Sequence, residues 1–301
     1  TVAFTPSSGA AAAPRVLSYR AASSGGVALA PDDPARSESL VAWTGLDDRR
    51  PQAFVTRLSA RGEKLAQRMV SRTRGEASGV AVAAVGPTSH VVGWTETGGP
   101  EPGVHLVRLG PSLETVGKAR YLGAGTSEPS LLATPSGLVA AYLDGGAPRL
   151  VRLGADLAET SPAARLSPRT AAAASPRVAS AGDDLWLTWV ERPEGAPGRV
   201  AVTRIGAAAE EIPGARVELD LDVAAGDCAF SAATDAARPV LLCQTRGLAP
   251  EIVEITVPSE GTSRRTFVLL TSRGGAPPAT AGDALFHAQS SGVLSRVDLA
   301  R

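Results

Sequence analysis

Short apolar runs that end at or beside an aromatic residue recur along the chain. Six copies, the last two weaker, lie around positions 43, 94, 142, 189, 243 and 288, at separations of 45 to 54 residues: Ser39–Thr44, His90–Thr95, Gly137–Tyr142, Leu185–Val190, Val240–Gln244 and Leu285–Gln289. Runs of this length that are rich in Val, Leu and Trp are typical of β-strands. A spacing of this size is typical of repeat proteins in which each unit is a small four-stranded sheet. The pattern therefore predicts six β-sheet repeats.

A second apolar strand follows each copy after about a dozen residues, in five of the six with an Arg before its last apolar residue. The six strands are Phe54–Leu58, Leu106–Gly110, Leu150–Gly154, Ala201–Gly206, Ile252–Ile255 and Leu294–Val297. Gly, Pro and acidic residues separate the two strands of each pair, and these residues form turns. Each pair is predicted to be a hairpin. We interpret the recurring arginines as structural groups that pair with a carboxylate or a carbonyl: Arg57, Arg108, Arg152, Arg204 and Arg296.

Two more strands complete each repeat. The outer strands share an Arg followed by apolar residues: Gln67–Ser71, Ala119–Gly123, Ala163–Ser167 and Ala215–Leu219. The strands before the hairpins are rich in small residues: Gly26–Ala30, Gly79–Ala83, Pro129–Ala133, Pro176–Ser180 and Cys228–Ala232. Small side chains suit the crowded strand nearest the central axis of a β-propeller. The repeats are therefore predicted to be propeller blades.

The last repeat lacks an outer strand, because the sequence stops at Arg301 soon after its hairpin. Pro14–Ser18 fits the outer-strand pattern and is expected to pair beside Leu294–Leu299, which would leave no open sheet edge. The prediction is an all-β, six-bladed β-propeller of four-stranded antiparallel blades, the last completed by an N-terminal strand. Residues 1–13 are expected to be a flexible linker without regular structure, and residues 14–301 one propeller with these approximate blades: 24–73, 76–123, 126–168, 172–220, 222–273, and 274–301 with 14–20.

Composition narrows the classes of partner. Thirty Lys and Arg residues balance thirty Asp and Glu residues. A net charge of zero lacks the basic surface that nucleic acids and anionic membranes require, so neither is expected as a partner. No stretch reaches the roughly 20 apolar residues of a membrane-spanning helix, and no transmembrane segment is expected.

The two cysteines, Cys228 and Cys243, lie on consecutive predicted strands at equal distances from the turn at 234–238. Residues placed in this way face each other in an antiparallel hairpin, with Cβ atoms roughly 4.5–5.5 Å apart. A disulfide is predicted, and two buried thiols are the alternative. A disulfide would place the protein outside the cytosol, in the periplasm, on the outer surface or secreted. Residues 1–13 would then follow a removed signal or a lipid anchor.

The repeat resembles the sialidase-like β-propellers of exported bacterial proteins. Their blades carry a Trp-Thr strand, a turn rich in Gly and acidic residues, and a Val-x-Arg-Leu strand, and the resemblance covers about residues 14–301. The resemblance holds for the blades and does not extend to the sialidase active site. The Asp-box, Ser-x-Asp-x-Gly-x-x-Trp, is absent, and residues 180–186 have the wrong spacing for it. Sialidases also need an arginine triad and a tyrosine nucleophile, whereas Tyr19, Tyr121 and Tyr142 all occupy repeat positions on strands.

Acidic residues follow the aromatic strands in four blades: Asp47, Asp48, Glu96, Asp144 and Glu191. The last three each lie two residues beyond their aromatic residue, so the repeat is expected to place this set around one rim. Such a ring could bind a calcium ion, a basic peptide or sugar hydroxyls, and solvated turn charge is the alternative. The three histidines lack the spacing of metal ligands, and calcium is the only cofactor considered.

Two functions follow from these observations. The first is a non-catalytic extracytoplasmic binding or assembly module that recognises a protein or a glycan through one loop face, as part of a larger surface assembly. The second is a propeller glycoside hydrolase or lyase with carboxylates at its central mouth. The first is favoured because the Trp residues occupy strands, where they cannot form platforms for sugars.

Overall fold

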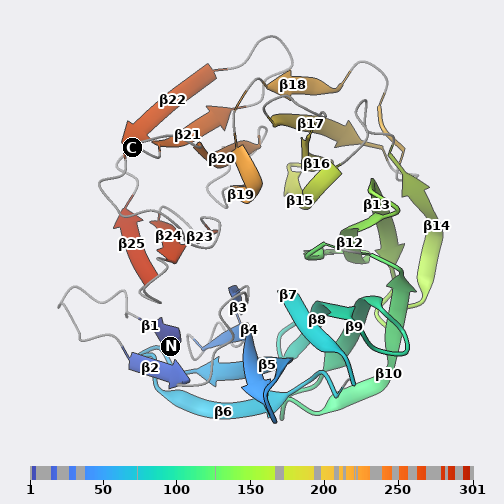
Figure 1. The fold of residues 1–301 in the computed structure, drawn as a ribbon, viewed down its shortest axis with the longest axis vertical. Coiled ribbons are helices and arrows are strands. Elements are labelled where there is room, and N and C mark those ends of the chain that lie inside the picture. Colours follow the sequence, from blue (N-terminus) through green and yellow to red (C-terminus); the bar gives the residue numbers. More distant parts are fainter. Residues whose placement is uncertain are drawn as a thin grey trace. The chain divides into compact units, whose positions relative to one another are not determined.

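The computed structural model describes the residues 2–4, 15–18, 27–31, 38–72, 74–125, 127–166, 173–192, 198–206, 210–212, 215–219, 221, 223–230, 239–245, 251–256, 263–268, 279–281, 284–288 and 294–298. All regular elements in these residues are β-strands (Figure 1). Among them is no helix of the length and apolarity needed to cross a membrane.

Most strands form four-stranded antiparallel sheets whose members follow one another in the sequence, as predicted. The first three sheets are β3 (Val27–Pro31), β4 (Ser39–Asp47), β5 (Arg50–Leu58) and β6 (Lys64–Met69); β7 (Glu76–Gly86), β8 (Ser89–Thr97), β9 (Gly103–Leu109) and β10 (Thr115–Gly123); and β11 (Ser130–Thr134), β12 (Gly137–Asp144), β13 (Ala147–Leu153) and β14 (Glu159–Arg165).

The later part of the chain repeats this order. Its sheets are β15 (Ala173–Ala181), β16 (Asp184–Glu191), β17 (Arg199–Ile205) and β18 (Val217–Leu219); β19 (Val223–Phe230), β20 (Val240–Thr245), β21 (Glu251–Thr256) and β22 (Ser263–Val268); and the three strands β23 (Ala279–Ala281), β24 (Ala284–Ala288) and β25 (Leu294–Asp298).

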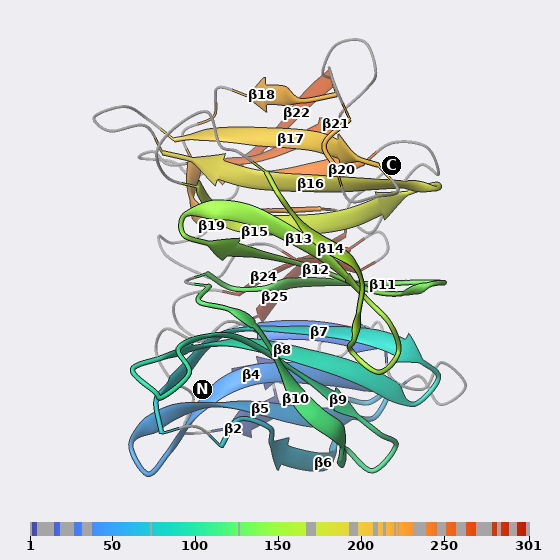
Figure 2. The same cartoon turned by 90° about the vertical axis from the view of Figure 1, so that its right-hand side faces the viewer.

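The described chain divides into two compact units, 1–145 with 151–162, and 146–150 with 163–301. In the first unit, β7 packs against β3, β4 and β5, and Figure 2 shows these two sheets lying against each other. Their shared core includes Leu40, Val55, Val92, Trp94 and Leu109. In the second unit, β19 packs against β15 and β16, with Val190, Val202, Leu221, Cys228 and Cys243 in the core.

The second strand of each of the first four sheets is buried along most of its length. In β8, for example, every residue from His90 to Glu96 is buried. A strand covered on both faces carries apolar residues without alternation. This burial explains the continuous apolar runs that mark the repeat in the sequence.

The recurring arginines have the structural role that the sequence predicts. Arg57 lies 3.8 Å from the Glu38 carboxylate, and Arg204 lies 3.3 Å from that of Asp184. Arg108 donates to the carbonyl oxygen of Ala155 at 2.8 Å. The prediction is confirmed for these three; the side chain of Arg296 lies outside the described residues.

The N-terminal segment differs from the expectation of an unstructured linker. Val2–Phe4 form β1, which pairs antiparallel with β2 (Arg15–Ser18) through Val2 and Ser18, Ala3 and Val16, and Phe4 and Arg15. Residues 2–4, all apolar, thus form a short strand in a two-stranded sheet, and the rest of the linker expected over residues 1–13 lies outside the described residues. The strand predicted at 14–18 is present as β2. Its pairing beside Leu294–Leu299 stays a prediction, and Pro14 and Tyr19 lie outside the described residues.

Cys228 and Cys243 form the predicted disulfide, with an S–S distance of 2.13 Å. They are opposite partners on β19 and β20, with Cα atoms 4.1 Å apart, and both side chains are buried. Disulfides persist in oxidising compartments, so the bond fits an extracytoplasmic location.

Replacing both cysteines, Cys228→Ser with Cys243→Ser, should lower the free energy of unfolding by about 3 kcal/mol, since the bridge joins residues 15 positions apart and restricts the unfolded chain accordingly. Urea denaturation followed by tryptophan fluorescence measures this loss. The wild type under reducing conditions should match the variant, and equal midpoints for the oxidised wild type and the variant would contradict the role of the bridge.

Candidate functional site

The five predicted rim carboxylates have different environments. Asp47 and Asp48 are exposed at the turn between β4 and β5, and Asp144 is half-buried at the end of β12. Glu96 and Glu191 are buried, with relative exposures of 5% and 0%. Two of the five carboxylate side chains are therefore buried, and the other three are exposed or half-buried.

Glu96 lies two residues beyond Trp94 on β8 and faces His105 on β9. The distance from its Oε2 atom to the Nε2 atom of His105 is 3.6 Å. The His105 ring stacks on Trp94 with centroids 5.6 Å apart, and its Nε2 atom is 2.7 Å from the Glu101 carbonyl oxygen. A carbonyl only accepts, so Nε2 carries the hydrogen in this contact. Glu96 is thus buried beside His105, whose ring in turn stacks on Trp94.

Glu191 is also buried two residues beyond a Trp, here Trp189 on β16. Its Oε1 atom accepts a hydrogen bond from the Trp189 indole at 3.0 Å and pairs with Arg216. The Arg216 guanidinium also lies over the Trp189 ring, 4.9 Å from its centroid. A buried carboxylate needs such partners. We call these two arrangements, Trp94–Glu96–His105 and Trp189–Glu191–Arg216, the Trp–Glu clusters.

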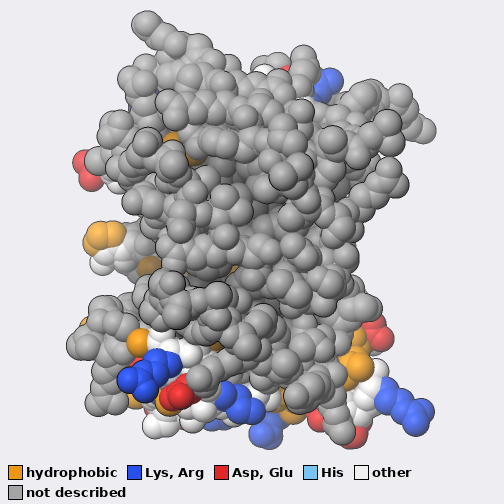
Figure 3. All heavy atoms as spheres, turned by 90° about the vertical axis from the view of Figure 1, so that its left-hand side faces the viewer, with side chains coloured by type: hydrophobic (Ala, Val, Ile, Leu, Met, Phe, Trp, Pro, Cys, Tyr) orange, Lys and Arg blue, Asp and Glu red, His pale blue; other side chains and the backbone are white. Residues whose placement is uncertain are grey.

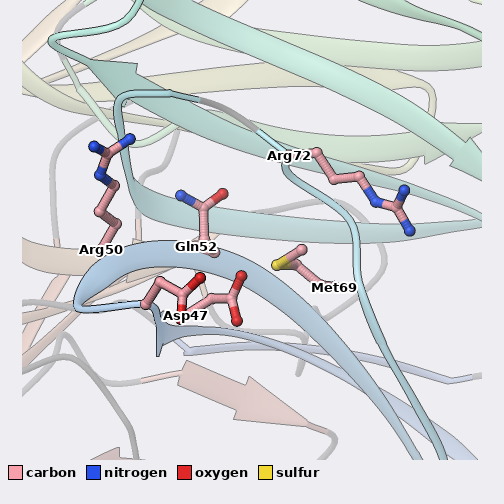
Figure 4. A pocket seen from close by; sticks show the side chains of 6 residues that line it. Asp47, Arg50, Gln52, Met69 and Arg72 are labelled. Carbon is pink, nitrogen blue, oxygen red and sulfur yellow. The ribbon is translucent and has the colours of Figure 1, made fainter.

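Asp47 and Asp48 border a hollow of about 580 Å³ in the first unit. Its lining also includes Arg50, Gln52, Met69 and Arg72 (Figure 4). These side chains come from the β4–β5 hairpin, the end of β6 and the loop after it, which the β5–β6 pairing of Phe54 with Met69 brings together.

Hydrogen bonds hold two of the lining side chains in place. The Ser71 hydroxyl donates to Gln52 Oε1 at 2.8 Å, and Gln52 Nε2 donates to the Gly75 carbonyl at 3.3 Å. Arg50 Nη1 donates to the Arg74 carbonyl at 3.0 Å. The hollow therefore has a buried amide and one tethered guanidinium, with two carboxylates beside them.

The turn at this hollow is a two-residue hairpin turn with a left-handed backbone. Residues 46–50 are all exposed, and both central residues are left-handed, with φ of 44° at Asp48 and 68° at Arg49. Asp47 pairs with Arg50 across the turn. Two consecutive positive φ angles define the type I′ hairpin turn, which matches the twist of the strands and favours Asn and Gly.

The lining of the hollow is mainly charged and polar. Its six residues are two carboxylates, two guanidinium groups, an amide and a thioether. The calcium ion considered for an acidic ring would meet both arginines here. In the described part of the chain, no three His, Cys, Asp or Glu residues cluster as metal ligands. Figure 3 shows charged side chains of both signs close together on the described surface of one face.

Solved structures identify the class of fold. The N10 neuraminidase-like protein of influenza A/little yellow-shouldered bat/Guatemala is similar with a TM-score of 0.55 and 8% identity, over 90% of each chain. Hsv2 of Kluyveromyces lactis gives 0.52 and 12%, over 91% of this chain and 74% of that one. TolB of Acinetobacter baumannii gives 0.47 and 15%, over 83% of this chain and 56% of TolB, so the chain spans about half of TolB.

The chain thus has the β-propeller fold, and its resemblance to sialidase-like propellers is one of fold. No protein-family model and no curated protein matches the sequence.

The Trp–Glu clusters can be tested by charge removal. Glu191→Gln keeps an acceptor for the Trp189 indole but removes the charge of one of the two carboxylates beside the buried Arg216 guanidinium, the other being Glu218 at 3.3 Å, and breaking a buried pair costs up to about 3–5 kcal/mol. Urea denaturation should show this loss. The matched control is Asp184→Asn on the same strand, because the Asp184–Arg204 side chains are 45% and 41% exposed and such pairs contribute up to about 1 kcal/mol. Equal losses in the two variants would contradict a structural role of Glu191.

Proposed function

We propose that this protein is a non-catalytic binding or assembly module that recognises a protein or a glycan through the propeller face carrying the β4–β5 turn. The observation behind this proposal is the exposed hollow, where the Asp47 and Asp48 carboxylates lie beside Arg50 and Arg72. A concave site with fixed polar groups suits the recognition of a polar ligand.

The same residues give less support to a glycoside hydrolase. That reaction needs two carboxyl groups about 5–10 Å apart on either side of the scissile bond. Glu96 and Glu191 are enclosed in the Trp–Glu clusters, and Asp47 and Asp48 are exposed side chains beside two arginines. Similarity to a neuraminidase-like protein at 8% identity concerns the fold and carries no activity.

We place the module outside the cytosol, on the outer surface, in the periplasm or secreted, with a lipid tether through a removed N-terminal region as one form of attachment. The Cys228–Cys243 disulfide supports this location. A surface assembly would supply the partner that the exposed hollow binds.

We further propose six blades, the last formed by β23–β25 and completed by residues 14–18. Its support is the repeat spacing in the sequence together with the three-stranded sheet β23–β25, which is one strand shorter than the four-stranded sheets. In this arrangement β2 pairs with β1 along one edge and with β25 along the other.

Deleting residues 1–20 should destabilise the protein far more than deleting residues 1–12. The longer deletion removes the proposed closing strand and its backbone hydrogen bonds, each contributing about 1 kcal/mol; the shorter one removes β1 alone. Thermal melting of both variants measures the difference. If the two melt alike, the closure is wrong.

The binding face can be mapped by site-specific photo-crosslinking. A benzophenone amino acid in place of Arg49, at the exposed turn, should crosslink one partner in cells of the native host. The same substitution at Lys118, an exposed residue of β10, is the control and should give no adduct.

Mass spectrometry of the adduct distinguishes a protein from a glycan. Equal labelling from positions 49 and 118, or none from either, would argue against recognition through this face.

A further inference from the structure

We propose that the hollow at the β4–β5 turn binds a peptide segment of another protein that presents a basic and an acidic side chain next to each other. This inference rests on the proposed function and gives the chemistry of the partner. It starts from the hairpin turn, where the backbone conformation favours glycine but two charged residues are present.

The backbone of the turn favours glycine. A left-handed conformation costs an L-residue free energy that glycine does not lose, and Asp tolerates it better than Arg. Asp48 and Arg49 are both left-handed and both exposed. The cost at Arg49 is therefore not recovered by packing of its side chain within the fold.

Another hairpin of the same chain shows what the turn needs. Gly145 and Gly146, between β12 and β13, have φ of 58° and 76°, close to the angles of Asp48 and Arg49. Asp144 precedes them as Asp47 precedes Asp48. The glycine pair meets the backbone requirement of such a turn without side chains. Asp is among the residues that such a turn favours, whereas the Arg49 side chain is not required by this backbone, and its exposure leaves it available for contacts outside the chain.

The charges around the hollow define the ligand. Asp47 and Asp48 attract an ammonium or guanidinium group, and Arg50 and Arg72 attract a carboxylate, with which arginine forms paired hydrogen bonds. Arg50 is already oriented by the Arg74 carbonyl. A ligand of one sign would gain from one pair and be repelled by the other, whereas a segment with both signs meets both pairs.

The remaining surroundings favour a peptide over a sugar. The six lining residues contain no aromatic ring on which a sugar could stack, and Met69 offers a flexible apolar contact. An apolar residue beside the charged pair of the peptide would contact Met69.

The test uses blocked hexapeptides, acetylated and amidated so that only side chains carry charge, titrated into the full chain and followed by NMR. A peptide with a central Leu-Lys-Glu should shift the backbone amides of residues 46–52 and 69–72. It should bind at least five-fold more tightly than peptides with Gln in place of Lys or of Glu, and more weakly as salt is added.

The double variant Asp48→Gly with Arg49→Gly separates binding from folding. It should weaken peptide binding at least five-fold while its Tm stays within about 2 °C of the parent, because glycine suits both positions. Asp183→Gly, at the exposed β15–β16 turn, is the control and should bind as the parent does.

The inference is overturned if peptides of a single charge sign bind equally well, if the shifts map to other residues, or if the double variant binds as tightly as the parent. Should position 49 crosslink a partner while the Leu-Lys-Glu peptide shows no preference, the proposed function stands and the inference fails. A glycan crosslinked at position 49 would likewise leave the proposed function standing and overturn the inference.

Discussion

Burial of the second strand in each sheet is the constraint on which the other features depend. Polar atoms on such a strand have no access to water, and each must find a partner within reach. The Trp43 indole donates to the Thr56 hydroxyl at 2.9 Å, and Thr188 donates to the Ala201 carbonyl at 2.9 Å. The Tyr142 hydroxyl donates to the Leu122 carbonyl at 3.0 Å. Trp43 and Tyr142 are therefore held by local polar partners, whereas the Trp94 indole nitrogen is buried without a hydrogen-bond partner in the described residues.

This constraint separates the acidic residues into two groups. Glu96 and Glu191 lie two residues beyond a buried Trp, while the strand is still covered. Glu96 lies beside His105, and Glu191 accepts from the Trp189 indole and pairs with Arg216. Asp47 and Asp48 lie four and five residues beyond Trp43, past the buried part of β4. Asp144 also lies two residues beyond its aromatic residue, Tyr142, but it is the last residue of β12 and is half-buried. Whether the strand is still covered at that residue therefore decides the burial of the carboxylate. The spacing is visible in the sequence, but the length of the covered strand is not.

The sequence predicts the strands whose apolar pattern is strong, their antiparallel order and the disulfide, because burial on both faces leaves a clear signal and two cysteines at equal distances from a turn can meet. It misses β1, which has only three residues, and β22, where Ser263–Val268 includes two arginines and two hydroxyl side chains. It also misses the hollow. Arg50, Gln52, Met69 and Arg72 meet there because β5 and β6 pair in one register, and residues 50 to 72 show no motif that announces this.

Non-glycine residues with a left-handed backbone occur both in the core and at the exposed β4–β5 turn. Leu113 and Leu157 have φ of 62° and 65°, and their side chains are 1% and 4% exposed. Burying a Leu side chain contributes about 1.5–3 kcal/mol, which exceeds the roughly 1–2 kcal/mol that a left-handed residue costs. Packing alone explains these two. Asp48 and Arg49 have the same kind of backbone with exposed side chains, so burial contributes nothing in return. The core accounts for the two leucines, whereas the backbone of Asp48 and Arg49 follows from the type I′ hairpin turn, which matches the twist of β4 and β5.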